Sequence, residues 1–224
     1  MSLIDDVIRY YAERAPVYDE TAGFTDLEAE KLRATLKKRY QSIFHGRNVL
    51  EIACGSGYWT KVIGKVAKSV LATDINPSLI STAKDRCKHL PNIRFQIVDA
   101  YTLNGVTGNF DAAFGNGWWS HIPKANLQDF LSALHGKLNP GALVMFVDQL
   151  PYDGFFRKQD NEGNILEQRI LPDSRSFMIV KNFPTEQEIK DSLVNIADDI
   201  RYTERPEEKS WQIMYRVKEK QVHK

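Results

Sequence analysis

Apolar residues at helical spacing open the chain and predict an amphipathic helix over residues 1–14. Residues 15–24 contain proline and glycine and are predicted to form a loop. A second helix is predicted from Thr25, with Glu28 at capping-box spacing, to about Ser42. The apolar positions of the first helix share one face, which must cover another part of the protein. They are Ile4, Val7, Ile8 and Tyr11.

From residue 48 the pattern changes to short β-rich runs that alternate with helical stretches. This alternation predicts a mostly parallel sheet with helices on both faces. Asn76 followed by Pro77 marks the start of one intervening helix, and Asn139-Pro140-Gly141 is predicted to stop another, which ends near Leu138. The predicted strands cover residues 48–53, 69–74, 93–98, 110–114 and 142–148.

Beyond residue 150 the alternation of β-rich runs and helical stretches is interrupted. Two β-rich runs, 165–170 and 177–181, flank Leu171-Pro172-Asp173-Ser174, and they predict an antiparallel hairpin inserted into the α/β pattern. A second capping box, at Thr185 and Glu188, then predicts a helix to about residue 197. The last predicted strands are 200–202 and 211–217, and the second of these alternates apolar with polar residues, as in antiparallel pairing.

These elements predict one α/β domain over residues 1–224 with a Rossmann-like, doubly wound sheet of seven strands. The sheet is expected to be mostly parallel, with an antiparallel last strand. The predicted parts are an N-terminal helical lid (1–45), a cofactor-binding core (46–150), the hairpin insertion (151–183) and a C-terminal helix with strands (184–224).

The first strand runs into a loop, Gly55-Ser56-Gly57, that carries almost no side chain. Glycine permits backbone angles that other residues resist, so a ligand can lie against the main chain there. The helix predicted next, over residues 58–67, would present free amide groups to an anionic or carboxylate-bearing group. The loop is therefore predicted to hold a ligand.

Three acidic residues stand at or just inside the ends of the first three strands: Glu51, Asp74 and Asp99. In an open parallel sheet, ligands bind at those ends, near the point where strand order reverses. Asp74 follows the glycine loop at the distance that suits a carboxylate accepting hydrogen bonds from ribose hydroxyls. A dinucleotide fingerprint requires a third glycine where Thr60 stands, which weakens the alternative of an NAD(P)-dependent oxidoreductase.

Read in order, the run from Val49 to Gly57, then Asp74, then Val98-Asp99-Ala100 resembles the motif set of class I S-adenosylmethionine-dependent methyltransferases. The segment 11–19 is similar to the start of ubiquinone and menaquinone type methyltransferases and their small-molecule relatives. The resemblance covers roughly residues 11–147. It implies S-adenosyl-L-methionine as cofactor and S-adenosyl-L-homocysteine as product.

For the methionine end of that cofactor, the resemblance implies contacts from Gly55 and Gly57, with Ala53 beside them. Glu51 matches the acid that supports the loop and the cofactor's amino group through water. Asn116, after the fourth strand, lies where family members place the reacting methyl group.

For the nucleoside end, Asp74 matches the ribose-binding carboxylate and Ile75 the apolar contact next to it. Asp99 matches the residue that faces the adenine amino group, and Ala100 would contribute its backbone.

For several aromatic residues the sequence allows either a functional or a structural role. Tyr11 and Tyr18 are expected either to contact cofactor or acceptor beneath the helical lid or to be ordinary core residues. His121 is either a catalytic base or the cap of a helix that starts near Pro123. Trp118 and Trp119 line an acceptor pocket or pack under helices, and at least one is expected to pack because adjacent residues face different ways.

Tyr152 and Asp148 follow the fifth strand and are candidates for acceptor contact, with a capping or surface role as the alternative for Asp148. The hairpin would hang over the same end of the sheet. Its Arg169 and Arg175 either meet an anionic substrate or are solvated.

Charge and cysteine content narrow the class of protein. Lys plus Arg number 30 and Asp plus Glu number 29, so the nearly neutral chain creates no overall electrostatic field that would favour nucleic-acid binding. A homodimer remains an open alternative. The start of the chain lacks a signal peptide and the longest apolar run is too short to span a bilayer, which predicts a cytoplasmic protein. Cys54 and Cys87 are expected to be free thiols, and no metal site is expected.

The sequence therefore predicts a methyltransferase that acts on an oxygen, nitrogen or carbon of a small molecule. The Asn/Asp-Pro-Pro-aromatic tetrapeptide of enzymes that methylate base or glutamine amides is absent at the fourth strand, where Gly115-Asn116-Gly117-Trp118 stands. The non-enzyme alternative is a protein that binds S-adenosylmethionine or a partner without turnover.

Overall fold

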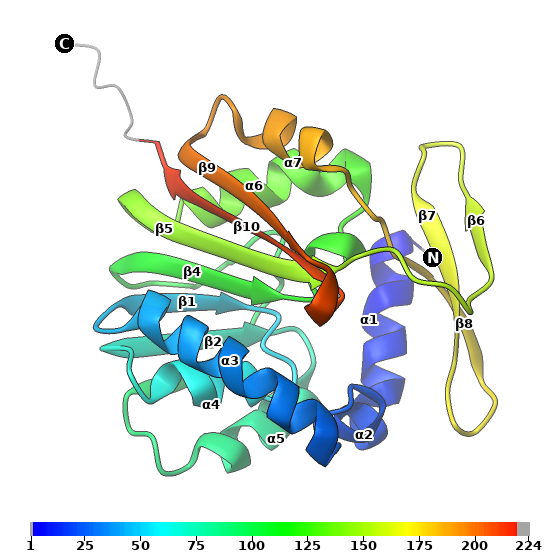
Figure 1. Cartoon of the computed structure of the whole chain (residues 1–224), viewed down its shortest axis with the longest axis horizontal. Coiled ribbons are helices and arrows are strands. Elements are labelled where there is room, and N and C mark those ends of the chain that lie inside the picture. The colour runs from blue at the N-terminus through cyan, green and yellow to red at the C-terminus, as the bar shows by residue number, and fades with distance from the viewer. Residues whose placement is uncertain (1, 219–224) are drawn as a thin grey trace.

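The computed structural model describes residues 2–218, except for the side chain of Leu32. Met1 and residues 219–224, which the predicted domain includes, lie outside that description. At the centre stands a seven-stranded sheet in the order β3-β2-β1-β4-β5-β10-β9 (Figure 1). Its strands are β1 (Asn48–Ile52), β2 (Ser69–Asp74), β3 (Ile93–Ile97), β4 (Phe110–Asn116), β5 (Leu138–Gln149), β9 (Ala197–Arg205) and β10 (Ser210–Val217).

The strand directions confirm the predicted sheet. Strands β3, β2, β1, β4 and β5 pair in parallel, whereas β10 runs antiparallel to both β5 and β9. After β3 the chain returns to the other side of β1 to add β4, so the strand order reverses between β1 and β4. Ligands of open α/β sheets bind at such a switch point.

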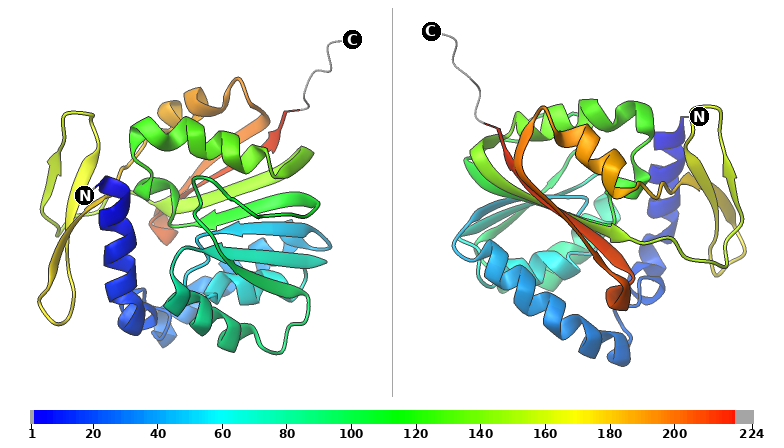
Figure 2. Two further views of the ribbon diagram at one scale, coloured as in Figure 1. Left: turned by 180° about the vertical axis from the view of Figure 1, so that it is seen from behind. Right: turned by 45° about the horizontal axis from the view of Figure 1, so that its top comes forward.

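Helices cover both faces of the sheet (Figure 2). Successive residues of a strand point to opposite faces, so Val49 packs with one helix layer and Leu50 with the other. The Val49 face meets α3 (Leu27–Phe44) and α4 (Tyr58–Gly64), with α5 (Pro77–Cys87) packed beside α4. The Leu50 face meets α6 (Leu127–His135) and α7 (Glu186–Leu193).

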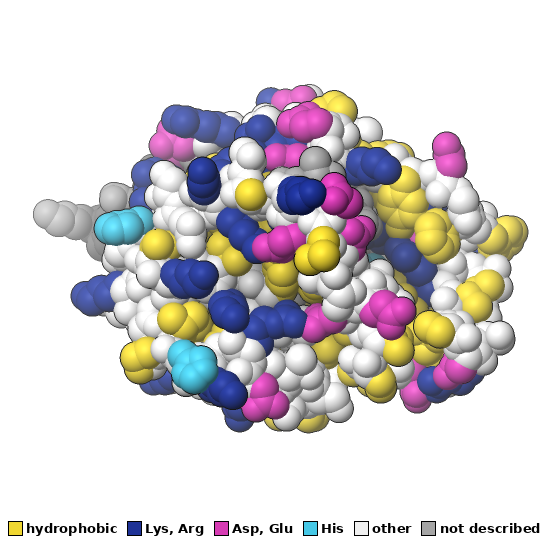
Figure 3. Space-filling model, turned by 60° about the horizontal axis from the view of Figure 1, so that its bottom comes forward, with side chains coloured by type: hydrophobic (Ala, Val, Ile, Leu, Met, Phe, Trp, Pro, Cys, Tyr) yellow, Lys and Arg dark blue, Asp and Glu magenta, His cyan; other side chains and the backbone are white. Residues whose placement is uncertain are grey.

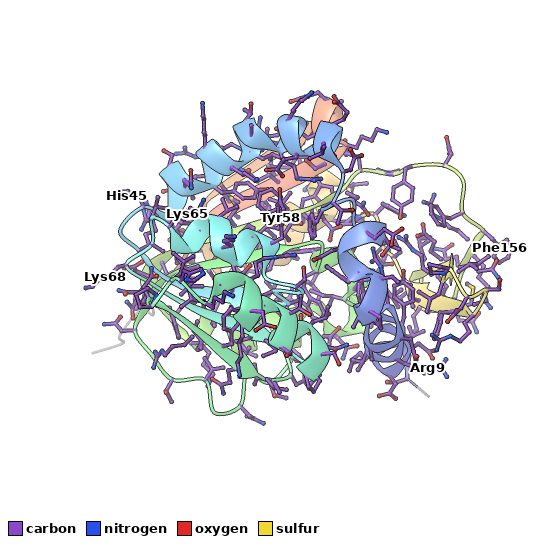
Figure 4. The ribbon with its side chains drawn as sticks, turned by 90° about the horizontal axis from the view of Figure 1, so that it is seen from below. Arg9, His45, Tyr58, Lys65, Lys68 and Phe156 are labelled. Carbon is purple, nitrogen blue, oxygen red and sulfur yellow. The ribbon has the colours of Figure 1, made fainter. Side chains whose placement is uncertain are left out.

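Helix α1 (Leu3–Arg14) stands at the carboxyl ends of the parallel strands, between the core and a second, three-stranded sheet (Figures 1 and 4). That sheet has the order β6 (Arg157–Gln159), β7 (Ile165–Ile170) and β8 (Ser176–Val180). Val7 and Tyr10 of α1 are buried in one apolar cluster with Phe177 of β8. The predicted hairpin is β7–β8. Strand β6 was not predicted because it is short and polar, Arg157-Lys158-Gln159.

The predicted loop at 15–24 is wrong in part. It contains a 3-10 turn (Ala15–Val17) and the short helix α2 (Tyr18–Thr21). The N-cap of α3 is Asp26 rather than Thr25, since the Asp26 side chain accepts from the backbone N–H groups of Glu28 and Ala29. A carboxylate two residues before Glu28 therefore outcompetes the predicted capping box.

Several element boundaries also differ from the prediction. Helices α4, α6 and α7 end three or four residues early, at Gly64, His135 and Leu193. Strand β5 begins at Leu138 and includes the predicted stop at Pro140, because Leu138 pairs with Phe110 ahead of an irregular register at Phe110/Ala112. Further 3-10 turns are Trp119–His121, Lys124–Asn126 and Pro206–Glu208.

The capping signals at the other helices are confirmed. Asn76 caps α5 with Pro77 in the first turn, and Thr185 forms a capping box with Glu188 at α7. Cys54 and Cys87 are free thiols, as predicted. Within residues 2–218, no helix combines the length and apolar character needed to cross a membrane.

Candidate active site

A cavity lies where the strand order reverses, at the carboxyl ends of β1, β2 and β4, and the inner face of α1 roofs it. Its wall is mostly apolar, with a few polar groups, which is typical of small-molecule sites. The lining residues are Ile4, Val7, Ile8, Tyr11, Tyr18, Ala53, Gly55, Thr73, Asp74, Ile75, Leu79, Val98, Asp99, Ala100, Tyr101, Asn116, Gly117, Trp118 and His121.

The glycine loop shapes the floor of the cavity through its backbone. Ala53, Gly55 and Gly57 have φ angles of 51°, 56° and 76°, in the left-handed region that residues with a Cβ rarely adopt. Ala53 takes this conformation despite its side chain, and such strain is concentrated at functional sites. A Cβ on Gly55 would lie 2.9 Å from the hydroxyl of Tyr18, so the first residue of α2 approaches the loop there.

Gly57 serves the fold rather than the cavity wall. A Cβ at this position would lie 2.8 Å from the Cβ of Ala83 on α5, so the glycine allows α5 to pack against the loop. Gly57 does not line the cavity, although the sequence placed it with the cofactor-binding residues.

Asp74 ties the end of β2 to the glycine loop. One carboxylate oxygen accepts the backbone N–H of Gly55 at 2.9 Å, and the other accepts that of Asn76 at 2.9 Å. Burial raises the pKa of Asp74, while these amide donors favour its charged form. Because each oxygen keeps a further lone pair, the carboxylate can also accept hydrogen bonds from a ligand.

The other residues predicted for the nucleoside end lie on the same wall. Ile75 is 38% exposed and presents an apolar surface to the cavity. Asp99 is half-buried and accepts the backbone N–H of Tyr101 at 2.8 Å, and Ala100 lies between them. Asn116 reaches the cavity from the end of β4.

Glu51 lies below the loop and outside the cavity wall. Its side chain is buried, and one carboxylate oxygen, Oε2, has no hydrogen-bond partner among the described residues. Burial raises its pKa to about 8. The structure thus places this acid in a supporting layer behind Ala53 and Gly55, without direct access to the cavity.

Tyr11 and His121 join the roof of the cavity to its wall. The Tyr11 hydroxyl lies 2.8 Å from Nε2 of His121, and Nδ1 of His121 lies 2.7 Å from the carbonyl oxygen of Val180. A carbonyl only accepts, so Nδ1 carries the ring proton and Nε2 accepts the Tyr11 O–H. His121 therefore does not cap the following helix, which was the alternative role.

The pKa of His121 is lowered to about 3, chiefly by burial and then by the charge of Lys181. A neutral ring at physiological pH is a weak base. It holds the hydroxyl of Tyr11, a residue of the cavity wall, and the hydroxyl oxygen keeps lone pairs that can accept further hydrogen bonds.

The side chains of Trp118 and Trp119 point in different directions, as expected for adjacent residues. Trp118 lines the cavity and its indole N–H is buried without a partner among the described residues. Trp119 packs in the core against Phe146 and Trp211.

Tyr152, Arg169 and Asp148 lie in ionic networks next to the cavity. The Tyr152 hydroxyl donates to Glu167 at 2.9 Å and accepts from Arg169 at 2.6 Å. Asp148 is buried and pairs with Lys181 at 3.1 Å, so the surface role considered for it is wrong. Arg175 is half exposed and pairs with Glu13 and Asp173.

Sequence reasoning missed part of the cavity wall. Ile4, Ile8 and Tyr101 line it, but apolar helical spacing and a lone tyrosine give no sign of what they face. Lys181 was also missed, because a lysine at the end of a strand is ordinarily solvated and only the fold buries it against Asp148. Among the described residues, no group of His, Cys, Asp and Glu side chains is arranged to hold a metal.

Comparison with known proteins gives a family match. Residues 49–141 match the model of a family described as "Methyltransferase domain". The 2-phytyl-1,4-naphtoquinone methyltransferase of Synechococcus elongatus is 28% identical over 161 residues, which are 69% of this chain and 68% of that protein. The phosphoethanolamine N-methyltransferase 1 of Caenorhabditis elegans is 30% identical over 89 residues, and the match spans 40% of this chain but only 19% of that protein.

Solved structures extend the likeness over nearly the whole chain. The structure titled "DhpI-SAH complex structure" is 28% identical with a TM-score of 0.76 and covers 98% of this chain and 100% of its own. The structure titled "DhpI-SAM-HEP complex" is also 28% identical, with a TM-score of 0.77 and coverages of 96% and 99%. The match therefore includes α1 and the three-stranded sheet.

Proposed function

We propose that this chain, which belongs to the class I S-adenosylmethionine-dependent methyltransferases, transfers the methyl group of that cofactor to a small-molecule acceptor held beneath α1. The accepting atom would be an oxygen, nitrogen or carbon. The relatives named above methylate a quinone and phosphoethanolamine, both of them small molecules.

The residues present fit the cofactor. The bare backbone at Gly55 lets a ligand lie against the loop, and the unpartnered Trp118 N–H is a buried donor on the same cavity wall. We assign the ribose to Asp74 and the adenine to Asp99, with Ile75 and Ala100 as neighbours. The methionine end would lie by Ala53, Gly55 and Asn116.

When bound, S-adenosylmethionine supplies an already activated methyl group, so the protein mainly has to align an acceptor and exclude water. Ile4 and Ile8 of α1 close the cavity with apolar surface. Tyr11 is held by His121 at the same place. We propose that its hydroxyl oxygen positions the acceptor, while His121 keeps the hydroxyl oriented.

The observation that carries this proposal is the Asp74 carboxylate, which lies on the cavity wall and is hydrogen-bonded to the glycine loop. Calorimetry with S-adenosylmethionine, S-adenosylhomocysteine and NAD tests it directly. We expect Asp74→Asn to weaken binding of S-adenosylhomocysteine by roughly 1–3 kcal/mol. Asp85→Asn on the exposed side of α5 is the matched control.

Binding of NAD alone would refute the cofactor assignment. Unchanged affinity in folded Asp74→Asn would refute only the ribose assignment. Turnover over a broad panel of small-molecule acceptors separates an enzyme from a protein that binds the cofactor without turnover, and silence across that panel would favour the second.

A further inference from the structure

A hollow opens between the three-stranded sheet and the core, and basic and hydrophobic side chains line its walls (Figure 3). The segment after β5, which leaves the core, and strand β7 of the three-stranded sheet bring together Tyr152, Phe155 and Arg169. The guanidinium of Arg169 lies 4.7 Å from the centre of the Phe155 ring. This cluster adjoins the end of the cavity at Tyr11 and His121: burial raises the pKa of Tyr11 and lowers that of His121, and the charge of Arg169 opposes the first shift and adds to the second.

Two arginines in the cluster share a single carboxylate. Arg157 donates to Glu167 at 2.6 Å, and Arg169 pairs with the other oxygen of Glu167 at 2.7 Å. Glu167 is fully buried, whereas the side chains of Arg157 and Arg169 keep 24% and 19% of their surface exposed. Both arginines also retain a buried N–H group, Nη2 of Arg157 and Nε of Arg169, that has no partner among the described residues. The cluster therefore has more donors than its own carboxylate can satisfy.

A third arginine adds to this excess. Arg14 lies 4.9 Å from the centre of the Tyr18 ring and 5.7 Å from that of Tyr11, both on the cavity wall. Its Nε donates to the Thr21 hydroxyl at 2.8 Å, and no described carboxylate lies within ion-pair distance. Lys181, by contrast, is balanced by Asp148. Tyr11 thus lies near the charges of both Arg14 and Arg169, and Arg14 has no carboxylate partner among the described residues.

We propose that the methyl acceptor carries an oxyanion group, a carboxylate or a phosphate-type group, that binds in this hollow between Arg169, Arg157 and Arg14. Guanidinium groups match such oxyanions with paired hydrogen bonds. The aromatic rings of Tyr152 and Phe155 would pack against the apolar part of the same molecule. This inference rests on the proposed function, because it names the chemistry of the acceptor at that site.

The test uses the full-length protein saturated with S-adenosylhomocysteine, so that no reaction occurs. Inorganic phosphate and sodium acetate are titrated separately by calorimetry at constant ionic strength, with acetamide as the neutral probe. We expect at least one anion to bind and acetamide not to bind. Tighter phosphate than acetate binding would assign a phosphate-type acceptor, and the reverse order would assign a carboxylate.

Arg169→Gln and Arg157→Gln are each expected to weaken anion binding by about tenfold, the effect of losing a charge-assisted pair. Lys158→Gln is the matched control, since this exposed residue follows Arg157 on β6 and the change removes the same charge. Both arginine variants leave the buried Glu167 with one partner fewer, which can unfold the small sheet. Arg14→Gln avoids this risk because no carboxylate depends on Arg14, and it too should weaken anion binding.

The affinity for S-adenosylhomocysteine is measured in each variant and separates the two proposals. If the wild-type protein does not bind S-adenosylhomocysteine, the proposed function fails. If it binds the nucleoside but neither anion, or if Arg14→Gln and the folded Arg169→Gln bind anions as the wild type does, the anionic acceptor is refuted and the methyltransferase proposal stands.

Discussion

The hydroxyl of Tyr11 and Nε2 of His121 are 2.8 Å apart, and this hydrogen bond links the roof helix to the loop that follows β4. It connects residues 110 positions apart in the sequence. Since the second ring nitrogen of His121 is taken up by Val180 at the end of β8, the same histidine also contacts the small sheet. Helix α1, the cavity wall after β4 and the three-stranded sheet are therefore all joined through the side chain of His121.

Removing the Tyr11 hydroxyl should affect turnover more than folding. We expect Tyr11→Phe to lower the free energy of unfolding by about 1 kcal/mol, the usual net value of one hydrogen bond. The activation free energy of turnover should rise by more than this amount, because the acceptor loses the oxygen that positions it. Denaturant unfolding and initial rates measure the two effects. Tyr10→Phe, whose ring packs on Phe177, is the control, and equal rates in both variants would argue against a role for Tyr11.

His121 should stay neutral well below physiological pH. Its folded pKa of about 3 is below its ordinary value of 6.5, so the unfolded chain binds a proton that the folded chain does not. The stabilisation is complete above pH 6.5 and is lost as the pH falls toward 3. We expect His121→Asn to remove about 2 kcal/mol of the difference in unfolding free energy between pH 7 and pH 5. Ring NMR shifts that titrate near pH 6.5 would contradict this.

Gly55→Ala and Gly57→Ala should differ in their effects on stability and on ligand binding. Gly46→Ala is the control, since Gly46 has a φ of +70° with open space around it and should lose about 1 kcal/mol of stability. Gly57→Ala should lose about 1–3 kcal/mol more because of its contact with Ala83. Gly55→Ala should cost more stability than the control but less than Gly57→Ala, because its Cβ would meet the end of the Tyr18 side chain rather than backbone, and it should bind S-adenosylhomocysteine roughly tenfold more weakly. Unaltered binding would show that the loop backbone does not contact the ligand.

Because of the buried carboxyl of Glu51, we expect the protein to become less stable as the pH rises. Burial raises its pKa from an ordinary value of 4.5 to about 8, so the folded chain keeps a proton that the unfolded chain loses over that window. The free energy of unfolding should fall from pH 5 to pH 8, and Glu51→Gln should lessen this fall by about 3 kcal/mol. The exposed Glu20→Gln should leave it unchanged. A Glu51→Gln profile parallel to that of the wild type would show that the carboxyl is already ionised at pH 5.

The sequence predicts the parts of the fold that depend on local pattern. The parallel direction of most strands follows from the alternation of strands and helices, and capping residues such as Asn76 and Thr185 act within four residues of themselves. The residues brought to the cavity from strand ends, such as Asp74 and Asn116, follow from the topology of a parallel sheet.

What the sequence leaves out depends on contacts between distant segments. The burial of Lys181 needs Asp148 and Ser120, and the tautomer of His121 needs Val180. Strand β6 forms because Arg157 and Lys158 pair with β7, although their own propensity is weak. No local pattern carries such pairings, and they are the ones that build the acceptor side of the site.

The position of α1 against β8 also has a consequence for the order of assembly. The helix is 12 residues long, a length at which an isolated helix is only marginally stable in water. One stabilising partner, Phe177, follows Tyr10 by more than 160 residues, so ribosomal synthesis completes α1 long before the strand that buries Tyr10. Helix α1 is thus made before the strand that helps to fix it, and a chain truncated before β8 would lack that part of the support for α1.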